Sequence, residues 1–478
     1  LGDVYKRQPS RSGLEVHVLA QKYDPRATVD GVSGTKYALN VSPYAPTIRF
    51  ESGRGESLPG FEMAGFLPLS RQQTILLDPS AIKGSGFGRL FVENHDGRVL
   101  LPAGSVLDLG VRGSLGIKAS QIDIAGSIIT PGGSISLTAS TVPYDLLQEY
   151  KLPGSKSPDL SALALYNHPD LGIVLGFGDA SALPGETITI YTAKGLEDGE
   201  TIGLKNGSVK KEVAVKDLEA TDAGLISLST DSFIDVSGLG IDDFFSLQRV
   251  PLVALAGGNV TMKARQLDLT KGSIDVSGGY HIPLASNRVR YADAGSIVLH
   301  SVSDPDFTTL RGGMNLGAKL SGFAGFSPIS PTGKPGLLDI KSPAVRISPN
   351  AQNAEGILGL APSFFDQGGF GTFRLSGIGL SGGADGNPST PGVEITGNAV
   401  LHPAIMRYRA ERRRGELMKN DYLPGGDMGH AASLFLSSEG LVDKNLDEGR
   451  KFQFMGVVRL GEGSSITLDP VSYTHLRA

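Results

Sequence analysis

Residues 118–133 have the sequence KASQIDIAGSIITPGG, and a close variant, KARQLDLTKGSIDVSGG, occupies residues 263–279. Apolar and polar residues alternate in both, which is typical of β-strands with one buried face. Glycines interrupt both segments, and the stretches between them are too short for a helix. A third copy, GLLDIKSPAVRIS, spans residues 336–348. Strand segments that recur within one chain predict a repeat architecture.

The apolar positions change parity inside each copy. In the first copy they are odd-numbered before the change, as in Leu115 and Ile117, and even-numbered after it, as in Ile122 and Ile124. A single strand has a side-chain period of two, so the change requires a corner between two strands. The corner sends the apolar side chains of both strands to the same interior. This predicts a chain that coils around one core.

Hairpin signatures between these strands are rare, Asn206-Gly207 being the exception, and long amphipathic helices are missing. We therefore predict an all-β protein, a right-handed parallel β-helix with a non-solenoid excursion and a short helix near the C-terminal part. Gly113 and Gly133 are 20 residues apart, which predicts coils of about 20 residues. The two copies of IDVSG, at 234–238 and 274–278, are then expected to lie two coils apart.

Two further repeats concern glycine and lysine. The segment PSAIKGSGFGRLFV (79–92) resembles PSFFDQGGFGTFRL (362–375), and glycine in the shared Gly-Phe-Gly setting is expected to let the chain turn sharply. Lys118, Lys263 and Lys341 occur at one position of the main repeat, so we expect them to mark one face.

The repeat divides the chain into segments. Residues 141–222 break the pattern, and MRYRAERRRGELMKNDY (406–422) is predicted to form a short basic helix. The expected segments are 1–8 and 471–478, which look like translated adaptor sequence from assembly; 9–74, an N-terminal flanking segment of mixed β structure; 75–140, β-helix coils; 141–222, an excursion or small β insertion; 223–405, β-helix coils; 406–422, the basic helix; and 423–470, a C-terminal β segment.

Composition narrows the function. The 478 residues include 65 Gly and no Cys, and the formal net charge is −5. Without cysteine, disulfides, thiolate zinc sites and cysteine nucleophiles are excluded. The small net charge offers no large basic field for nucleic acid, and no apolar run approaches the roughly 18 residues of a membrane span.

Acidic residues are the main candidates for chemistry. Asp235 and Asp275 share the IDVSG segment, and Asp123 and Asp268 share a position of the main repeat. Carbohydrate-active β-helix enzymes use such carboxylates, but here each lies between inward apolar residues and is expected to face solvent. The segment GGADGNPST (382–390) only faintly resembles a calcium-binding repeat, and the eight His are scattered. We therefore assign no catalytic, cofactor-binding or metal-ligating residues.

The segments GSIITPGGSISLTAS, GGNVTMKARQLDLTKGSIDVSGGY, YADAGSIVL and FFDQGGFGTFRLSGIGL resemble the filamentous haemagglutinin family of bacterial exoproteins. The likeness covers most of residues 75–405. It is a likeness of strands and glycines, so it is specific for architecture rather than for ligand. The family's amino-terminal secretion domain is not recognised, and export is therefore inferred for a parent protein.

The resemblance implies a segment of a large secreted or surface-exposed adhesin, a rigid rod that attaches to cells or glycans and is not an enzyme. It implies a two-partner secretion transporter in the outer membrane as partner of the parent protein, and no cofactor. A location outside a Gram-negative cell or at its surface follows, and a chain without cysteine suits that passage. Two alternatives stay open: a polysaccharide lyase or hydrolase, and an inert stalk that presents a separate effector domain.

Overall fold

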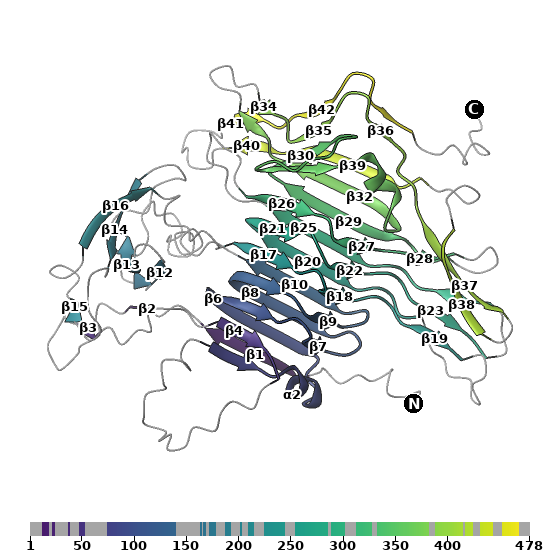
Figure 1. Cartoon of the computed structure of the whole chain (residues 1–478), viewed down its shortest axis with the longest axis horizontal. Helices are drawn as coiled ribbons and strands as arrows, with labels where there is room; N and C mark the ends of the chain where they lie inside the picture. Colours follow the sequence, from purple (N-terminus) through teal and green to yellow (C-terminus); the bar gives the residue numbers. More distant parts are fainter. Residues whose placement is uncertain are drawn as a thin grey trace.

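The computed structural model is mostly β-strand, with parallel sheets and almost no helix (Figure 1). It describes residues 12–18, 22–23, 37–38, 47–52, 74–139, 163–164, 166–168, 172–177, 187–192, 201–202, 209–214, 224–243, 254–284, 288–301, 312–326, 332–381, 388–413, 416–423, 431–442 and 452–467. The ends at 1–8 and 471–478 lie outside these residues.

Three ladders of parallel strands form the centre of the molecule. The long ladder stacks β1 (Gly13–Val18), the first parts of β6 (Arg89–Leu101) and β8 (Ser114–Ile124), β10 (Ser134–Ala139), β20 (Asn259–Ala264), β25 (Ser296–Ser301), β29 (Gly336–Ser342), β32 (Phe370–Gly377) and β39 (Ser433–Ser438). The second ladder contains β5 (Thr74–Leu77), β4 (Thr47–Phe50), the later parts of β6 and β8, β17 (Leu225–Leu228), β21 (Gln266–Leu269) and β26 (Gly313–Leu316). The third contains β7 (Val106–Asp108), β9 (Ser127–Ile129), β18 (Phe233–Asp235), β22 (Ser273–Asp275) and β27 (Lys319–Ser321).

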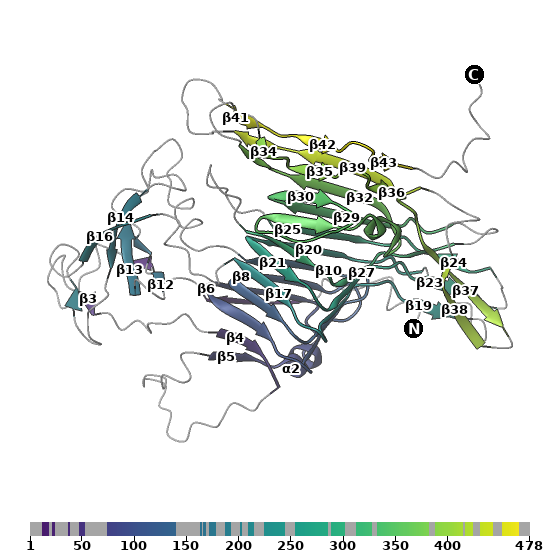
Figure 2. The ribbon, with the colours of Figure 1, turned by 45° about the horizontal axis from the view of Figure 1, so that its top comes forward.

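The chain visits the three ladders in turn. It runs along β8 from the long ladder into the second, continues through β9 in the third, and returns in β10, which pairs with the first part of β8. The same order recurs in β20, β21 and β22 and again in β25, β26 and β27. The ladders lie side by side in both ribbon views (Figure 2). Their inward side chains form one continuous core cluster from Ile48 to Ala432.

The recurring sequence segments occupy equivalent places in this stack. Leu115 is aligned with Ile135, Ile135 with Val260, Val260 with Ile297, and Ile297 with Leu338 in successive strands of the long ladder. All five side chains are buried. The second half of the repeat behaves likewise, since Ile122, Ile226 and Leu267 are successive partners in the second ladder. The alignment is therefore confirmed for the first two copies and for the first half of the third, whose second half (Ala344–Ile347) pairs in a different sheet.

A column of glycines starts successive strands of the long ladder. The amides of Ser134 and Asn259 donate to the carbonyl oxygens of Gly113 and Gly133, at 2.9 and 3.0 Å. A Cβ atom on Gly258 would overlap the carbonyl oxygen of Gly133 on the strand below. Close approach of stacked backbones therefore demands glycine at this corner, which accounts for part of the chain's glycine content.

The spacing expected for the IDVSG segments is wrong. β18 and β22 are adjacent strands, and Asp235 is aligned directly with Asp275. The distance from Gly113 to Gly133 predicts too short a coil for this part of the chain. Between β18 and β20 the chain adds β19 (Gly240–Asp242) and the residues that follow it, so one circuit takes 40 residues here. The number of residues between paired strands is therefore set by the connections, because the strands themselves keep their register.

The upper part of the stack changes the pattern. A fourth parallel sheet has the order β31 (Ile357–Leu360), β30 (Ala344–Ile347), β35 (Val393–Ile395) and β42 (Val458–Leu460), and β36 (Val400–Leu401) pairs with β43 (Ser465–Ile466). After β31 the chain forms a 3-10 helix, η2 (Pro362–Asp366), in place of a strand and then enters β32. The similar segment near the N-terminus forms the helix α2 (Pro79–Gly84) before β6.

The glycine-phenylalanine repeat is thus a short helix that leads into the long ladder. Gly86 and Gly369 occupy matching places after the helices and have φ values of 71° and 73°. This left-handed conformation favours glycine, so the expected sharp turn is confirmed at both places.

The short helix predicted for 406–422 is wrong. The segment forms two antiparallel strands, β37 (Arg407–Arg413) and β38 (Glu416–Leu423), and β37 also pairs with β28 (Ala324–Gly325). Tyr408 and Ala410 are buried while Arg407 and Arg409 are half-buried, a period of two that favours a strand. The arginines obscured this alternation.

The β37–β38 hairpin packs on the side of the stack. Its neighbours are β19, β23 (Tyr280–Ile282) and β24 (Arg290–Tyr291), which form a sheet of their own. The Tyr408 hydroxyl donates to the Gly278 carbonyl oxygen at 2.7 Å, and its ring meets Tyr291 edge-on at 5.7 Å. Next to these contacts lies a second, smaller hydrophobic cluster formed by Ile282, Val289 and Ala410.

Within 141–222 four of the described strands form a separate antiparallel sheet. Its order is β12 (Tyr166–His168), β13 (Gly172–Phe177), β14 (Thr187–Thr192) and β16 (Val209–Ala214). It shares no described strand with the parallel sheets and stands apart from them in Figure 1. The remaining short strands pair as β2 (Lys22–Tyr23) with β11 (Leu163–Ala164), β3 (Tyr37–Ala38) with β15 (Thr201–Ile202), β33 (Leu380–Ser381) with β34 (Pro388–Thr390), and β40 (Gly440–Val442) with β41 (Phe452–Met455).

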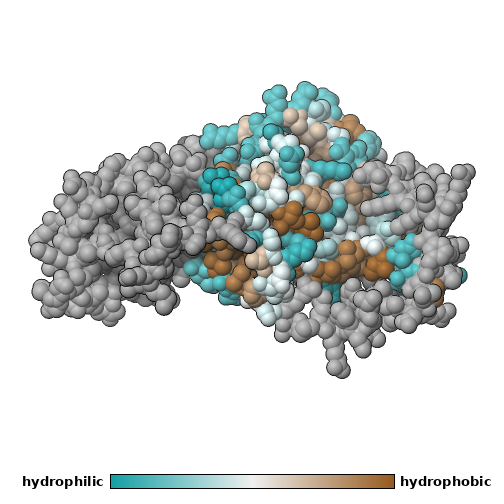
Figure 3. All heavy atoms as spheres, turned by 60° about the horizontal axis from the view of Figure 1, so that its bottom comes forward, coloured by the Kyte–Doolittle hydropathy of each residue, from teal (hydrophilic) through white to brown (hydrophobic). Residues whose placement is uncertain are grey.

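Exposed large apolar side chains gather at the two ends of the stack. Among the described residues they are Leu76, Val106, Val400, Phe435, Val458, Leu460 and Ile466, which belong to the first or last strands of their ladders. Figure 3 brings the N-terminal side forward and shows apolar residues between polar ones on its described surface. None of the helices in the described residues is long and apolar enough to cross a membrane.

Candidate binding surface

The outward face of the long ladder carries a row of polar residues, here called the lysine row. Its members are aligned in successive strands of the parallel register: Glu93, Lys118, Thr138, Lys263, His300 and Lys341. The inward residues on either side of each are buried, so alternation sends these side chains outward. The expectation that Lys118, Lys263 and Lys341 mark one face is confirmed.

The row has a regular spacing of charge. Neighbouring strands lie about 4.8 Å apart, so lysines in every second strand are about 10 Å apart along the stack. Lys118 Nζ lies 3.8 Å from Glu93 Oε1, and Lys341 Nζ lies 2.6 Å from Glu439 Oε2. Lys263 has no ion pair with any residue that the structure describes. Exposed ion pairs of this kind are weak, so the ammonium groups stay available to an anionic partner.

Histidines add to the same face. His300 Nε2 lies 3.4 Å from Asp339 Oδ1, and His17 Nδ1 lies 2.8 Å from Glu93 Oε2. The hydrogen bond with Glu93 raises the pKa of His17 above its usual value. The face therefore becomes more positive as the pH falls through the range in which His17 titrates.

Asp235 and Asp275, the acidic pair considered for catalysis, have structural partners. Asp235 Oδ1 accepts a hydrogen bond from the Ser237 amide at 2.9 Å, and Asp275 Oδ1 accepts one from the Ser277 amide at 2.8 Å. Each carboxylate therefore holds the turn that follows its own strand. Asp108, at the start of the same ladder, accepts from the Gly110 amide at 2.8 Å in the same way.

The second acidic pair lies on one outward row of the second ladder. Asp123 is aligned with Ser227, and Ser227 with Asp268, so the two carboxylates are two strands apart. Asp123 is ion-paired with Arg98 and accepts a hydrogen bond from Ser227 Oγ. Asp268 Oδ1 is buried and has no hydrogen-bond partner among the described residues. The two carboxylates thus lie on one face two strands apart, but Asp123 already interacts with Arg98 and Ser227.

One polar pair was not anticipated from the sequence. His281 Nε2 lies 2.9 Å from Asp243 Oδ2, and the His281 side chain is buried. The other ring nitrogen, Nδ1, is buried without a hydrogen-bond partner among the described residues. The two residues meet because β19 and β23 are adjacent although they are far apart in the sequence. Among the described residues, no Ser, Thr or Lys side chain forms a hydrogen bond with this imidazole.

Metal ligation finds no support in the described part of the chain. Within it, no group of three or more His, Asp or Glu side chains is placed to hold a metal ion. Asp304 and Asp306, two acidic residues close together in the sequence, lie outside the described residues, as do residues 382–387 of the calcium-like segment. No family model matches the chain, and no curated protein or solved structure matches it either.

Proposed function

We propose that the parallel ladders are the faces of a right-handed β-helical solenoid. Each circuit passes through the three ladders and returns one strand higher, with parallel pairing to the strand below. Parallel strands in one sheet are connected by crossovers that are right-handed in nearly all proteins, which supports the hand. The continuous core cluster supports a single interior, as a solenoid requires.

We further propose that this solenoid is a segment of a secreted or surface-exposed adhesin of the filamentous haemagglutinin type, which is not an enzyme. The segments that resemble the family lie in successive strands of the ladders. Export of the parent protein by a two-partner secretion transporter to the Gram-negative surface is part of the same proposal. A rigid rod suits attachment because its contacts are held in place before the partner arrives.

The observation that carries the binding role is the lysine row. Cations about 10 Å apart along a regular row match a linear polymer that carries negative charge at a similar interval. An acidic glycan is such a polymer, so we propose that the face binds acidic glycans on cells. Several weak contacts in a line would add to a useful avidity.

A glycan array tests this proposal with the purified chain. The triple variant Lys118→Gln, Lys263→Gln and Lys341→Gln is expected to bind acidic glycans about tenfold more weakly, and binding by the unmodified chain is expected to fall as salt rises. The control variant Lys83→Gln, Lys271→Gln and Lys334→Gln removes the same charge from exposed positions off this face and should bind normally.

Three results would contradict the proposal. Equal weakening by both triple variants would mean that net charge, and not the row, governs binding. Cleavage of a uronate polymer, lost on Asp123→Asn or Asp268→Asn, would favour the polysaccharide lyase or hydrolase. Failure to bind any glycan or cell would favour an inert stalk.

A further inference from the structure

A pocket opens where the third ladder ends. β27 is the last strand of that ladder, and the segment above it is η2 with the turn at Gln367–Gly369 instead of a strand. The Gly322 amide donates to the Gly368 carbonyl oxygen at 2.7 Å, which ties the turn to the end of β27. Because a helix does not fill the space of a paired strand, a cavity of about 290 Å³ remains between β27 and η2.

Aromatic side chains form the inner wall of this pocket. Phe364, Phe370 and Phe373 line it, and Phe370 and Phe373 are buried. Their rings pack on one another, with centroids 5.9 Å apart for Phe370 and Phe373 and 6.1 Å for Phe364 and Phe373. Leu320 and Leu338 complete the wall. The wall is rigid, because each ring is held by neighbours of the main core.

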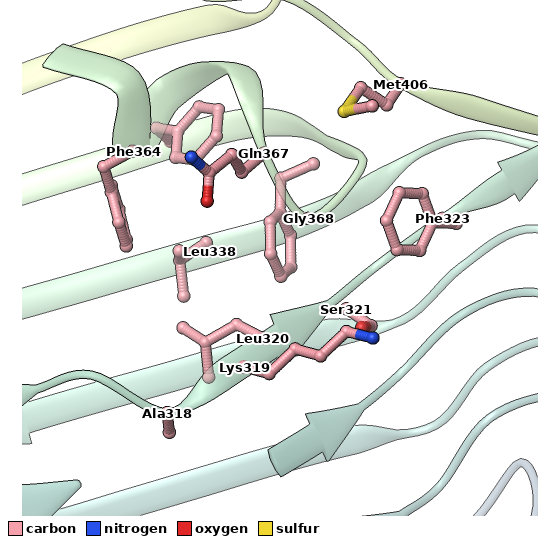
Figure 4. Close-up of a pocket in the computed structure, with 12 residues that line it drawn as sticks. Ala318, Lys319, Leu320, Ser321, Phe323, Leu338, Phe364, Gln367, Gly368 and Met406 are labelled. Atoms are coloured by element: carbon pink, nitrogen blue, oxygen red, sulfur yellow. The ribbon is translucent and has the colours of Figure 1, made fainter. Parts of the chain in front are cut away.

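Polar groups are confined to the rim. Figure 4 shows the Gln367 amide directed toward the space beside Phe364, and the Lys319 side chain along the lower edge with its nitrogen next to Ser321. Lys319 is exposed and has no ion pair or hydrogen bond through its side chain with any described residue. No Asp or Glu is among the lining residues, although Asp366 adjoins Gln367 at the end of η2.

We propose that this pocket binds a small amphipathic carboxylate, with an aromatic or branched apolar group against the phenylalanines and its carboxylate at Lys319. The volume lies near the lower end of the range for small-molecule sites, so the ligand is smaller than most drugs. A single unpaired ammonium at an apolar pocket attracts an anion and gives one end of the ligand a fixed place. The proposal does not depend on the adhesin role, because the pocket lies between β27 and η2 and no residue of the lysine row lines it.

The probe for a test is 2-naphthoate, which combines an aromatic group with a carboxylate, and 2-naphthylmethanol is its uncharged counterpart. Titration of each into the purified full chain, followed by the fluorescence of the naphthalene ring, gives a Kd. The chain contains no Trp, so the protein contributes little to this signal. Saturable binding of naphthoate at one site, with weaker binding of the alcohol, is expected.

Three variants separate the contributions. Lys319→Gln is expected to weaken naphthoate binding about fivefold and to leave the alcohol unchanged, because only the carboxylate meets the ammonium. Ala318→Phe places a ring at the lining and should abolish binding of both probes. Lys271→Gln removes a nearby exposed lysine that does not line the pocket and should change neither.

The proposal is overturned if naphthoate does not saturate, or if it binds Lys319→Gln and the unmodified chain equally well. Equal binding of naphthoate to Ala318→Phe would place the probe elsewhere and would also overturn it. A circular dichroism melting curve of each variant confirms that the chain is folded. If Ala318→Phe unfolds, competition of naphthoate with benzoate on the unmodified chain and on Lys319→Gln replaces it. Benzoate must then displace naphthoate from the unmodified chain and compete more weakly on Lys319→Gln.

Discussion

The interior of the stack and its C-terminal end use the same strand pattern with opposite results. Ile395 in β35 and Leu460 in β42 are partners in one parallel register, at the same inward position. Ile395 is 0% exposed, whereas Leu460 is 62% exposed. Val393 and Val458, the neighbouring pair in the same register, differ in the same way, at 0% and 40%.

The difference teaches where the stability of this protein comes from. In this sheet β35 has a strand on both sides and β42 has one on a single side, so the sequence of a strand alone does not decide whether its inward residues are buried. A strand inside the stack gains two apolar contacts for each side chain, and a terminal strand gains one. The stabilising free energy should therefore be concentrated in the interior.

The largest effect is expected from truncating the interior member of the matched pair. Ile395→Ala leaves a cavity in a closed core and should lower the free energy of unfolding by about 3 kcal/mol. The Leu460 side chain is mostly exposed, so Leu460→Ala removes little buried apolar surface and should lower the free energy of unfolding by less than about 1 kcal/mol. Urea unfolding of both variants, followed by circular dichroism, measures the difference. Equal costs for the two variants would break the comparison.

A smaller effect is expected from the glycine column. A methyl group on Gly258 would overlap a carbonyl oxygen of the strand below, so Gly258→Ala should cost about 2 kcal/mol through backbone displacement. Gly84, in α2 at the N-terminal end, has no atom within 4 Å of the position that a Cβ would take, and its substitution by alanine should be neutral or slightly stabilising. Thermal melting of the two alanine variants sharpens the contrast between interior and end. A destabilised Gly84→Ala variant would contradict it.

The β37–β38 hairpin on the side of the stack should contribute less to the free energy of unfolding than the glycine column does. Tyr408→Phe leaves the Gly278 carbonyl oxygen without its hydroxyl donor and should lower the free energy of unfolding by about 1 kcal/mol. Tyr280→Phe is the control, because the Tyr280 hydroxyl makes no hydrogen bond to a described residue. Burial raises the pKa of Tyr408 above its usual value of about 10. Its contribution is therefore present below about pH 10 and is lost as the pH rises through the folded-state pKa. Urea unfolding at pH 8 and pH 11 should show that the gap between the unmodified chain and Tyr408→Phe narrows at high pH.

The smallest effect is expected at the N-terminal end. The Asp78 carboxylate caps α2 by accepting from the Ser80 amide at 2.8 Å, and this hydrogen bond lowers its pKa below the usual value. The contribution is present above the unfolded-state pKa of about 3.9 and is lost as the pH falls through the folded-state pKa. Asp78→Ala should lower Tm slightly at pH 7 and by less at pH 2. An equal shift at both pH values would mean that the carboxylate charge has no part in the cap.

Much of the ladder register was predictable from the sequence. The parity of the apolar residues indicates the corner between Ile117 and Ile122, and the copies at Val260 and Leu338 fall in line with Leu115. The register can be predicted because a shift of one residue would turn all the apolar side chains of a strand toward water. The number of residues in a connection between strands leaves no such pattern in the sequence. For this reason the predicted separation of the two IDVSG segments is wrong.

The surfaces were less predictable than the core. The lysine row follows from the repeat, but the pocket at Phe364 and Lys319 depends on η2 taking the place of a strand, and no local pattern indicates that exchange. The basic hairpin resembles a helix in sequence because the charge of its arginines dominates its composition. The alternation of Tyr408 and Ala410 was present, but the ring of Tyr408 is buried only against residues distant in sequence.

The corner after Ala139 has a practical consequence. The chain leaves the long ladder there and re-enters the stack at Gly224, whose amide donates to the Ser120 carbonyl oxygen at 2.7 Å, and β17 then pairs with β8 in register. The fold thus accepts a large insert between two points that belong to one circuit. A protein engineer could graft a foreign module at these two residues and expect the scaffold to assemble around it.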